Sequence, residues 1–250
     1  MRNAMPNTPY LDATVRWRIK SGTLEDEEPN YRSRVEAVLR AGLATEVVRP
    51  ISAGKEAEVL LASLNGAPIA IKIYRLYRTS HRGGRPVKAD TMGWRAAHEF
   101  DMLLQAWKGG APVPTPARRA ENMISMRYLS DGDGPAPRLS DVRLEDPQPM
   151  FSQILDGIER LAKAGIVHGD LSAFNILVCR ERPWLIDFSE AMRVDRTGGA
   201  PWVRLTEARG QLTHGLTALN QYFRRYRLAI EVEPFVSRVV DALDRFHVLR

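Results

Sequence analysis

Hydrophobic and polar residues follow different periods in the two halves of the chain. In the first half, short apolar runs separated by turn residues predict a strand near Ala117 and further strands at residues 47–51, 58–63, 69–74 and 123–129. The dipeptide Asn65-Gly66 is typical of a tight turn between antiparallel strands. A short helix is expected before the strands, beginning at Ser33 and ending at Gly42. The first half is therefore predicted to be rich in strands.

Helical periodicity dominates the second half. Apolar residues three or four positions apart predict helices over residues 149–164, 206–225 and 234–246. Another helix, over residues 94–107, is expected among the strands, with Trp94, Ala97, Leu104 and Trp107 near one stripe. Glycines and prolines in residues 130–137 break both periods and predict a linker between two lobes. The predicted fold class is α+β, with a β-rich N-terminal lobe and a reduced, α-rich C-terminal lobe.

The bulk composition is that of a folded protein. Of the 250 residues, 44% are hydrophobic and 26% are charged, which excludes fibrous and wholly disordered chains. We expect a flexible arm at residues 1–32 and one domain at 33–250, divided into an N-terminal lobe (33–129), a linker (130–139) and a C-terminal lobe (140–250). No apolar run approaches the roughly 18 to 20 residues of a membrane-spanning helix, and the N-terminus lacks the apolar core of a signal peptide. The expected location is cytoplasmic.

Polar residues flank two apolar segments of the second half. The chain reads His168-Gly169-Asp170-Leu171-Ser172-Ala173-Phe174-Asn175 before Ile176-Leu177-Val178, and Asp187 follows Trp184-Leu185-Ile186. The apolar segments are expected to form a hairpin beneath a nucleotide. In kinases, one Asp accepts the proton of the acceptor hydroxyl, while an Asn and a second Asp hold Mg²⁺. Asp170, Asn175 and Asp187 fit these roles in that order, and His168 is expected to brace the loop.

The first half supplies further residues that suit phosphate binding. Lys72 lies within the apolar segment Ala70-Ile71-Lys72-Ile73-Tyr74, where its charge needs a partner, and Glu99 on the following helix is a candidate. The alternatives are a lysine on an edge strand and a glutamate on a helix surface. The segment from Ser52 to Val59 occupies the place of a phosphate-covering turn, although it has one glycine, Gly54, where ordinary protein kinases have three. Ser52, Gly54 and Lys55 are its candidate phosphate contacts.

These motifs resemble the RIO family of atypical protein kinases, in particular its branch without an N-terminal winged helix. The resemblance covers roughly residues 47–243 and includes Ser172, which is typical of RIO proteins and stands where conventional kinases usually have lysine. It implies a two-lobed, protein-kinase-like fold with ATP and Mg²⁺, or Mn²⁺ in its place, as cofactors. It also implies that Lys72 anchors phosphate, that Glu99 pairs with Lys72, and that Asp187 can become phosphorylated. Further implied nucleotide-binding residues are the gatekeeper Met126, the hinge residues Arg127, Tyr128 and Leu129, and Val59, Leu177 and Ile186.

The chain departs from the kinase pattern after Asp187. Phe188-Ser189-Glu190 replaces the usual family continuation, and Trp202 follows Ala200-Pro201 where conventional kinases have glutamate. We expect the residues that follow Asp187 here to be too few for the usual platform that binds a peptide substrate. These departures favour an atypical kinase.

Several functions are compatible with these motifs. The leading hypothesis is an atypical Ser/Thr protein kinase or ATPase that autophosphorylates. A small-molecule phosphotransferase of the aminoglycoside type and a nucleotide-switch factor for ribosome or ribonucleoprotein assembly are the alternatives, and a scaffold without catalysis is disfavoured because every phosphate-handling residue is present. The net charge of +6 and a basic run suggest RNA contact, although a solvated loop explains the same run. The cations of this run are Arg75, Arg78, Arg82, Arg85 and Lys88.

Overall fold

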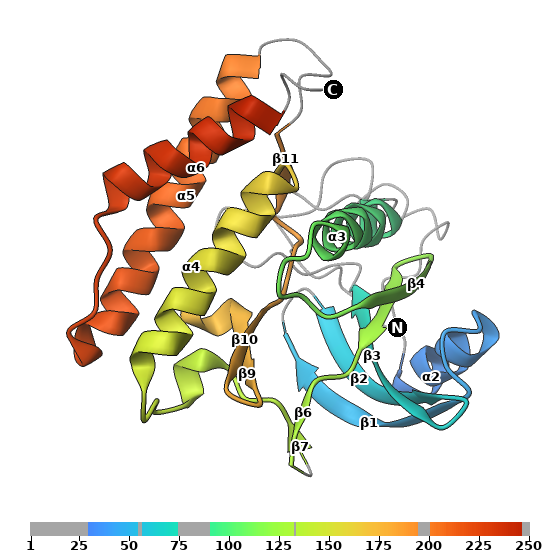
Figure 1. Cartoon of the computed structure of the whole chain (residues 1–250). Helices are drawn as coiled ribbons and strands as arrows, with labels where there is room; N and C mark the ends of the chain where they lie inside the picture. The colour runs from blue at the N-terminus through green and yellow to red at the C-terminus, as the bar shows by residue number, and fades with distance from the viewer. Residues whose placement is uncertain (1–29, 55–56, 75–90, 133, 195–200, 247–250) are drawn as a thin grey trace, which may run out of the picture. The chain divides into compact units, whose positions relative to one another are not determined.

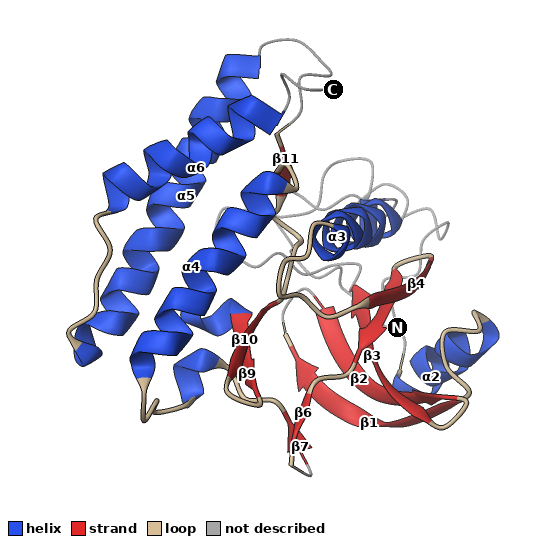
Figure 2. Cartoon of the chain, in the orientation of Figure 1, coloured by secondary structure: helices blue, strands red, loops and turns tan. Residues whose placement is uncertain are grey.

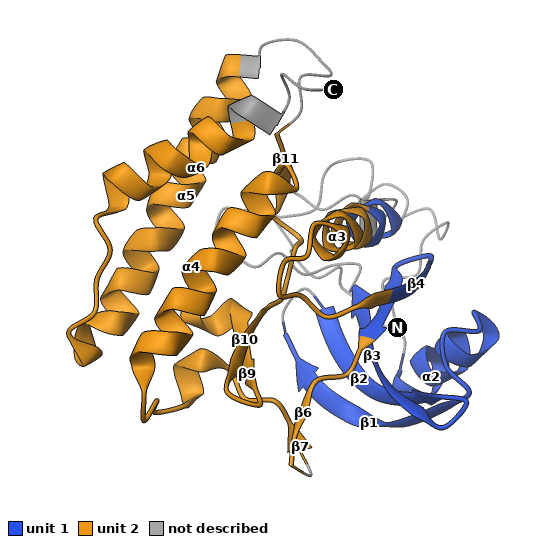
Figure 3. Ribbon diagram, viewed as in Figure 1, with its two compact units in different colours: residues 1–97, 117–126 blue, residues 98–116, 127–250 orange. Residues whose placement is uncertain are grey.

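The computed structural model describes residues 30–54, 57–74, 91–132, 134–194 and 201–246 (Figure 1). The chain divides into two compact units (Figure 3). Unit 1 contains Met1–Ala97 and Ala117–Met126, and unit 2 contains His98–Pro116 and Arg127–Arg250. Strands prevail in unit 1 and helices in unit 2, as the colours of Figure 2 show, which confirms the α+β class.

A five-stranded sheet forms the framework of unit 1. Its strands lie in the order β1-β2-β3-β5-β4, and β1, β2 and β3 pair antiparallel. The turn between β2 and β3 contains Asn65 and Gly66, both with positive φ, as expected of a tight hairpin. The predicted strands are therefore confirmed, with bounds of β1 (Glu46–Ala53), β2 (Ala57–Leu64), β3 (Ala67–Tyr74), β4 (Pro116–Ala120) and β5 (Met123–Arg127).

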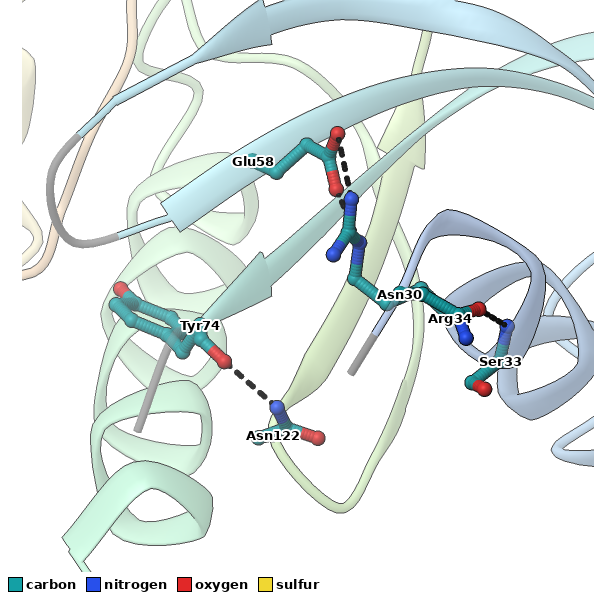
Figure 4. Close-up of polar contacts among 6 residues, drawn as sticks. All are labelled: Asn30, Ser33, Arg34, Glu58, Tyr74 and Asn122. Atoms are coloured by element: carbon teal, nitrogen blue, oxygen red, sulfur yellow. Dashed lines mark hydrogen bonds and ion pairs between the residues drawn. The ribbon is translucent and has the colours of Figure 1, made fainter. Parts of the chain in front are cut away.

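Helix α2 (Tyr31–Arg40) precedes the sheet and begins earlier than predicted. Its N-cap is Asn30, whose side chain accepts a hydrogen bond of 2.9 Å from the Ser33 backbone N–H (Figure 4). The prediction of Ser33 as the cap is wrong because asparagine is an equally good cap and lies one turn earlier. Gly42 adopts φ 64° just beyond the helix, as expected of a residue that ends one.

One face of the sheet forms the core of unit 1 with α2. Ile69, Ile71 and Ile73 alternate along β3 and, with Leu60 of β2, belong to a buried cluster that also contains Val38 of α2. Successive residues of a strand point to opposite faces, so Lys72 lies on the other face. Lys72, the predicted phosphate anchor, therefore lies on the face of the sheet that points away from α2.

Glu58 is a charged residue on the core face of β2. It lies opposite Ile73 and is 4% exposed. Arg34 of α2 reaches it with an ion pair of 2.7 Å between Nε and Oε2 (Figure 4). A buried charge is tolerated when it is paired, so this contact also fixes α2 on the sheet.

Helix α3 (Thr91–Lys108) begins in unit 1 and continues into unit 2. The stripe named in the sequence is not the buried face of this helix, because Trp94 is 65% exposed and Trp107 is 44% exposed. The large indoles dominated the pattern, whereas two alanines on the true stripe carry a weak hydrophobic signal. The residues buried along this helix are Ala96, Glu99, Met102, Leu103 and Ala106.

Three helices dominate unit 2: α4 (Pro147–Lys163), α5 (Pro201–Phe223) and α6 (Val232–Phe246) (Figure 1). Phe151 of α4 contacts Phe223 of α5 with ring centroids 4.8 Å apart. Burial raises the pKa of Tyr222, whose hydroxyl donates a 2.7 Å hydrogen bond to the Leu139 carbonyl. No helix in the described ranges is long and apolar enough to span a membrane.

Short elements complete unit 2. The predicted linker is not wholly irregular, because β6 (Ser130–Asp131) and β7 (Gly134–Pro135) pair antiparallel. The turn between these strands determines their pairing, and each strand is too short to show an alternation of apolar and polar residues. The other elements are the 3-10 turns η1 (Leu139–Asp141), η2 (Ala173–Asn175) and η3 (Arg224–Tyr226), and the strands β8 (Ile166–Val167), β9 (Ile176–Cys179), β10 (Arg182–Leu185) and β11 (Met192–Arg193).

Candidate active site

The hairpin of β9 and β10 places the ends of two polar segments next to each other in unit 2. Ile176 pairs with Leu185, and the Ile186 N–H donates a 3.0 Å hydrogen bond to the Asn175 carbonyl. Asn175 directly precedes β9, and Asp187 follows Ile186 just beyond the end of β10. The predicted hairpin is confirmed, and it brings Asn175 and Asp187 to the same end of the two strands.

Asn175 also binds Asp170 directly. Its side-chain nitrogen donates to the Asp170 carbonyl at 2.8 Å and to the Asp170 Oδ2 at 2.9 Å. Both acceptors are oxygens, so the amide nitrogen must face Asp170 and the amide oxygen points elsewhere. This arrangement orients the Asp170 carboxylate and leaves the Asn175 Oδ1 as the side-chain atom suited to a cation.

Asp187 occupies a turn with an uncommon backbone conformation. Its φ is 65°, in the left-handed region that few residues other than glycine adopt. The Ser189 hydroxyl donates to the Asp187 Oδ1 at 2.8 Å, and the Ser189 N–H lies 3.4 Å from the same oxygen. Left-handed residues of this kind cluster at functional sites, where surrounding contacts hold them.

Two neighbouring residues of α3 contact this turn. The Phe188 N–H donates to the Glu99 Oε1 at 3.2 Å, and the His98 Nε2 lies 2.7 Å from the Ala191 carbonyl oxygen. Glu99 is 2% exposed. The alternative of a helix-surface glutamate is therefore wrong, and α3 holds the backbone that follows Asp187.

His168 supports the strand that leads into Asp187. The residue is 3% exposed, its Nε2 lies 3.0 Å from the Ile186 carbonyl oxygen, and its ring centroid lies 4.8 Å from that of Phe188. The predicted bracing role of His168 is confirmed by these contacts.

The predicted phosphate-binding residues of unit 1 form a row across three strands. Ser52 of β1 lies opposite Val59 of β2, and Val59 lies opposite Lys72 of β3. Opposite residues of paired strands share a face of the sheet. Lys72 is 9% exposed and its Nζ lies 5.1 Å from the centroid of the Tyr74 ring. Because β3 lies between β2 and β5, the alternative of an edge-strand lysine is wrong.

The turn that is predicted to cover phosphate is described only in part. The Gly54 N–H donates to the Ala57 carbonyl at 2.9 Å, which closes the turn between β1 and β2. Gly54 and Ser52 are exposed. Lys55 and the basic run that contains Arg75, Arg78, Arg82, Arg85 and Lys88 lie outside the described residues.

The remaining predicted nucleotide contacts belong to both units. Met126 ends unit 1 and is half-buried, whereas Tyr128 and Leu129 belong to unit 2. Leu129 is buried in a small cluster against which Leu177 packs. Ile186 is half-buried. Its backbone N–H donates to the Asn175 carbonyl, and its carbonyl oxygen contacts His168.

A cavity of about 310 Å³ in unit 2 lies away from these residues. Its walls come from the end of α3, the loop after it, one face of α4, and β10. None of the predicted site residues lines this cavity.

The donor atoms suit a magnesium ion that also binds phosphate. Mg²⁺ is usually held by one or two carboxylates together with phosphate oxygens and water. Asn175 offers an amide oxygen and Asp187 a carboxylate, and the described residues contain no cluster of three or more His, Cys, Asp or Glu that would hold a metal by themselves. The residues therefore fit a metal that arrives with a nucleotide.

Comparison with solved structures defines the class of fold as protein-kinase-like. The Rio2 kinase of Chaetomium thermophilum, in a structure described as an ADP/Mg²⁺-phosphoaspartate complex, matches 92% of this chain and 74% of its own with a TM-score of 0.66 and 21% identity. A second structure of the same kinase gives a TM-score of 0.65 over 92% of this chain and 76% of its own.

The sequence comparisons identify the family. The RIO domain matches residues 58–234, so the chain belongs to the RIO family, as the motifs predicted. The RIO-type serine/threonine-protein kinase Rio1 of Haloferax volcanii is 32% identical over 62% of this chain and 58% of its own. The human serine/threonine-protein kinase RIO1 is 28% identical over 81% of this chain and 38% of its own. The chain spans about half the length of these curated relatives.

Sequence reasoning missed three contributors to the site. His98 contacts the segment that follows Asp187, and Ser189 contacts Asp187 itself. Gly169 packs against the segment that follows Asp187. For Ser189 a signal existed, because serine stands where conventional kinases have the glycine of Asp-Phe-Gly.

Proposed function

We propose that this chain is an ATP-dependent atypical Ser/Thr protein kinase that also phosphorylates itself. The observation that carries the proposal is the pair of hydrogen bonds from Asn175 to Asp170, at 2.8 and 2.9 Å, on the hairpin that also presents Asp187. RIO relatives named as serine/threonine-protein kinases support the same conclusion.

Each residue has a role in this proposal. Asp170 accepts the proton of the attacking hydroxyl while the oxygen of that hydroxyl bonds to the γ-phosphorus and the bond to ADP breaks. Asn175 and Asp187 hold Mg²⁺, or Mn²⁺ in its place, which when bound neutralises charge on the phosphates. Lys72 contacts the phosphates and pairs with Glu99.

We also propose how the chain divides into lobes and which residues surround the nucleotide. Residues 33–129 and 140–250 would be the two lobes of one kinase domain, with a linker at residues 130–139 and an arm at residues 1–32. Ser52, Gly54, Lys55 and Val59 would cover the phosphates, and Met126, Tyr128, Leu129, Leu177 and Ile186 would surround the adenine. A cytoplasmic location and membership of the branch without a winged helix stay predictions.

The test is transfer of labelled γ-phosphate from ATP with Mg²⁺, followed on protein and as free phosphate. Asp170→Asn should abolish both signals because the substituted amide cannot accept the proton. Asp101→Asn is the matched control, since Asp101 is an exposed carboxylate on α3. Free phosphate without stable label would favour an ATPase. Absence of both signals in the wild type would contradict the proposal and favour a small-molecule phosphotransferase or a scaffold.

The chemistry of the label identifies its site. The structure of Chaetomium thermophilum Rio2 is described as containing phosphoaspartate, and we propose that Asp187 accepts the phosphoryl group here. Acyl phosphates react with hydroxylamine, whereas phosphoserine and phosphothreonine do not. Label that hydroxylamine removes, and that Asp187→Asn lacks, would support this assignment.

The basic run favours a second candidate function, a nucleotide-switched factor that contacts RNA. Its cations are concentrated between Arg75 and Lys88, without a carboxylate among them. RNA affinity that falls steeply with salt, and less steeply once these cations are neutralised, would support it.

A further inference from the structure

We propose that Ser189 is a positioning residue that makes the two carboxylate oxygens of Asp187 unequal and thereby assigns metal binding to Oδ2. The inference rests on the proposed function, because it concerns how the same nucleotide-linked metal is held. It gives a role to the residue at which this chain departs from the Asp-Phe-Gly sequence of conventional kinases.

Ser189 makes two contacts with a single oxygen. Its hydroxyl lies 2.8 Å from the Asp187 Oδ1 and its backbone nitrogen lies 3.4 Å from the same atom. The hydroxyl contact is the shorter of the two, and a glycine could make only the longer one. Ser189 is half-buried and is not among the residues with positive φ, so its backbone does not require glycine.

The backbone around Asp187 is held on both sides of the carboxylate. His168 contacts the Ile186 carbonyl, and Glu99 accepts from the Phe188 N–H. Rotation of the carboxylate is soft in aspartate. The Ser189 hydroxyl restrains that rotation.

A hydrogen bond to Oδ1 changes the chemistry of both oxygens. Oδ1 shares its electron density with the serine proton and becomes the weaker ligand, so Oδ2 becomes the stronger one. Mg²⁺ demands nearly octahedral geometry at short distances, which makes its affinity sensitive to the rotation of a ligand carboxylate. Groups that orient metal ligands typically contribute about 10- to 100-fold to metal affinity.

The experiment measures Mn²⁺ binding to the protein–ADP complex by electron paramagnetic resonance, which requires no turnover. Ser189→Ala and Ser189→Gly should each raise the Mn²⁺ dissociation constant about 10-fold, whereas Ser189→Thr, which keeps the hydroxyl, should stay near wild type. ADP affinity in the presence of EDTA should not change in any variant. Ser152→Ala, an exposed serine of α4, is the matched control.

The outcomes separate the inference from the proposed function. Wild-type Mn²⁺ affinity in both Ser189→Ala and Ser189→Gly would overturn the inference and leave the kinase proposal intact. An equal loss of metal-free ADP affinity would also overturn it, because that loss indicates a structural role. If the wild-type ADP complex binds no Mn²⁺, the inference and the assignment of Asn175 and Asp187 as metal ligands both fail.

Discussion

Gly169, between His168 and Asp170, sets how closely two backbone segments of unit 2 approach. Its φ is 84°, and a Cβ atom at this position would lie 1.9 Å from the Glu190 carbonyl oxygen. The obstacle is backbone rather than a flexible side chain, so it cannot move aside without displacing the turn after Asp187. Gly169 therefore couples the loop of Asp170 to the turn of Asp187.

Gly169→Ala should destabilise the protein much more than Gly66→Ala does. Gly66 has φ 85° and no atom within 4 Å of its hypothetical Cβ, so it isolates the backbone strain, about 1 to 2 kcal/mol. Gly169→Ala adds the collision to this strain. Urea unfolding of both variants measures the difference, and nucleotide turnover should fall only in Gly169→Ala. Equal destabilisation in the two variants would show that the close approach is unimportant.

The residues proposed to be catalytic could be located in the sequence because the pattern that marks them is local, whereas their supporting contacts are not local. Asp170, Asn175 and Asp187 lie beside apolar strands in a readable order. The contact of Gly169 with Glu190 and that of His98 with Ala191 join segments that the sequence separates, and no period along the chain reports such pairs.

At the scale of elements, α2 is attached to the sheet through a charge as well as through its apolar face. Arg34 and Glu58 have side chains that are 18% and 6% exposed, and residue 58 is the first that the RIO domain match includes. Glu58 also follows Ala57, whose carbonyl closes the turn that contains Gly54. A helix outside the matched domain therefore contacts the strand that follows the turn proposed to cover phosphate.

Arg34→Met should cost about 3 kcal/mol in the free energy of unfolding, because it leaves the buried Glu58 carboxylate without this cation. The double variant Arg34→Met/Glu58→Leu should recover most of that loss. Arg32→Met is the control, since the Arg32–Glu36 pair is 89% and 53% exposed and exposed pairs contribute only about 0.3 to 0.5 kcal/mol. Chemical denaturation measures all three. A double variant no more stable than Arg34→Met would argue against a buried-charge penalty.

The elements also show where sequence patterns lose resolution. Strands β1 to β3 were predictable from apolar runs and the Asn65-Gly66 turn, because residues 69–74 of β3 are buried one after another and the turn has the positive φ of a tight hairpin. The buried face of α3 was not, because the burial of Glu99 depends on its contact with the turn after Asp187. A period of 3.6 marks an amphipathic helix, yet it does not identify a buried carboxylate as part of the packed face.

At the scale of the whole molecule, the proposed function assigns phosphate binding to residues of both compact units. Lys72 belongs to unit 1, and Asn175 and Asp187 belong to unit 2. A ligand present at a hundred times its dissociation constant stabilises the native state by about 2.7 kcal/mol, and it does so for every segment whose opening disrupts the bound state. One binding event should therefore protect segments in both units.

Hydrogen–deuterium exchange with ADP and Mg²⁺ tests this linkage. Exchange should slow in β2 and β3 of unit 1 and in residues 166–176 of unit 2, and EDTA should remove the metal-dependent part of the protection. Lys72→Met should lower protection in both units together, because the lost contact weakens a shared ligand. Lys108→Met, at the exposed end of α3, should behave as the wild type. Protection that Lys72→Met removes from unit 1 alone would mean that the nucleotide is held by unit 2 without Lys72, and the role of Lys72 as the phosphate anchor would be wrong.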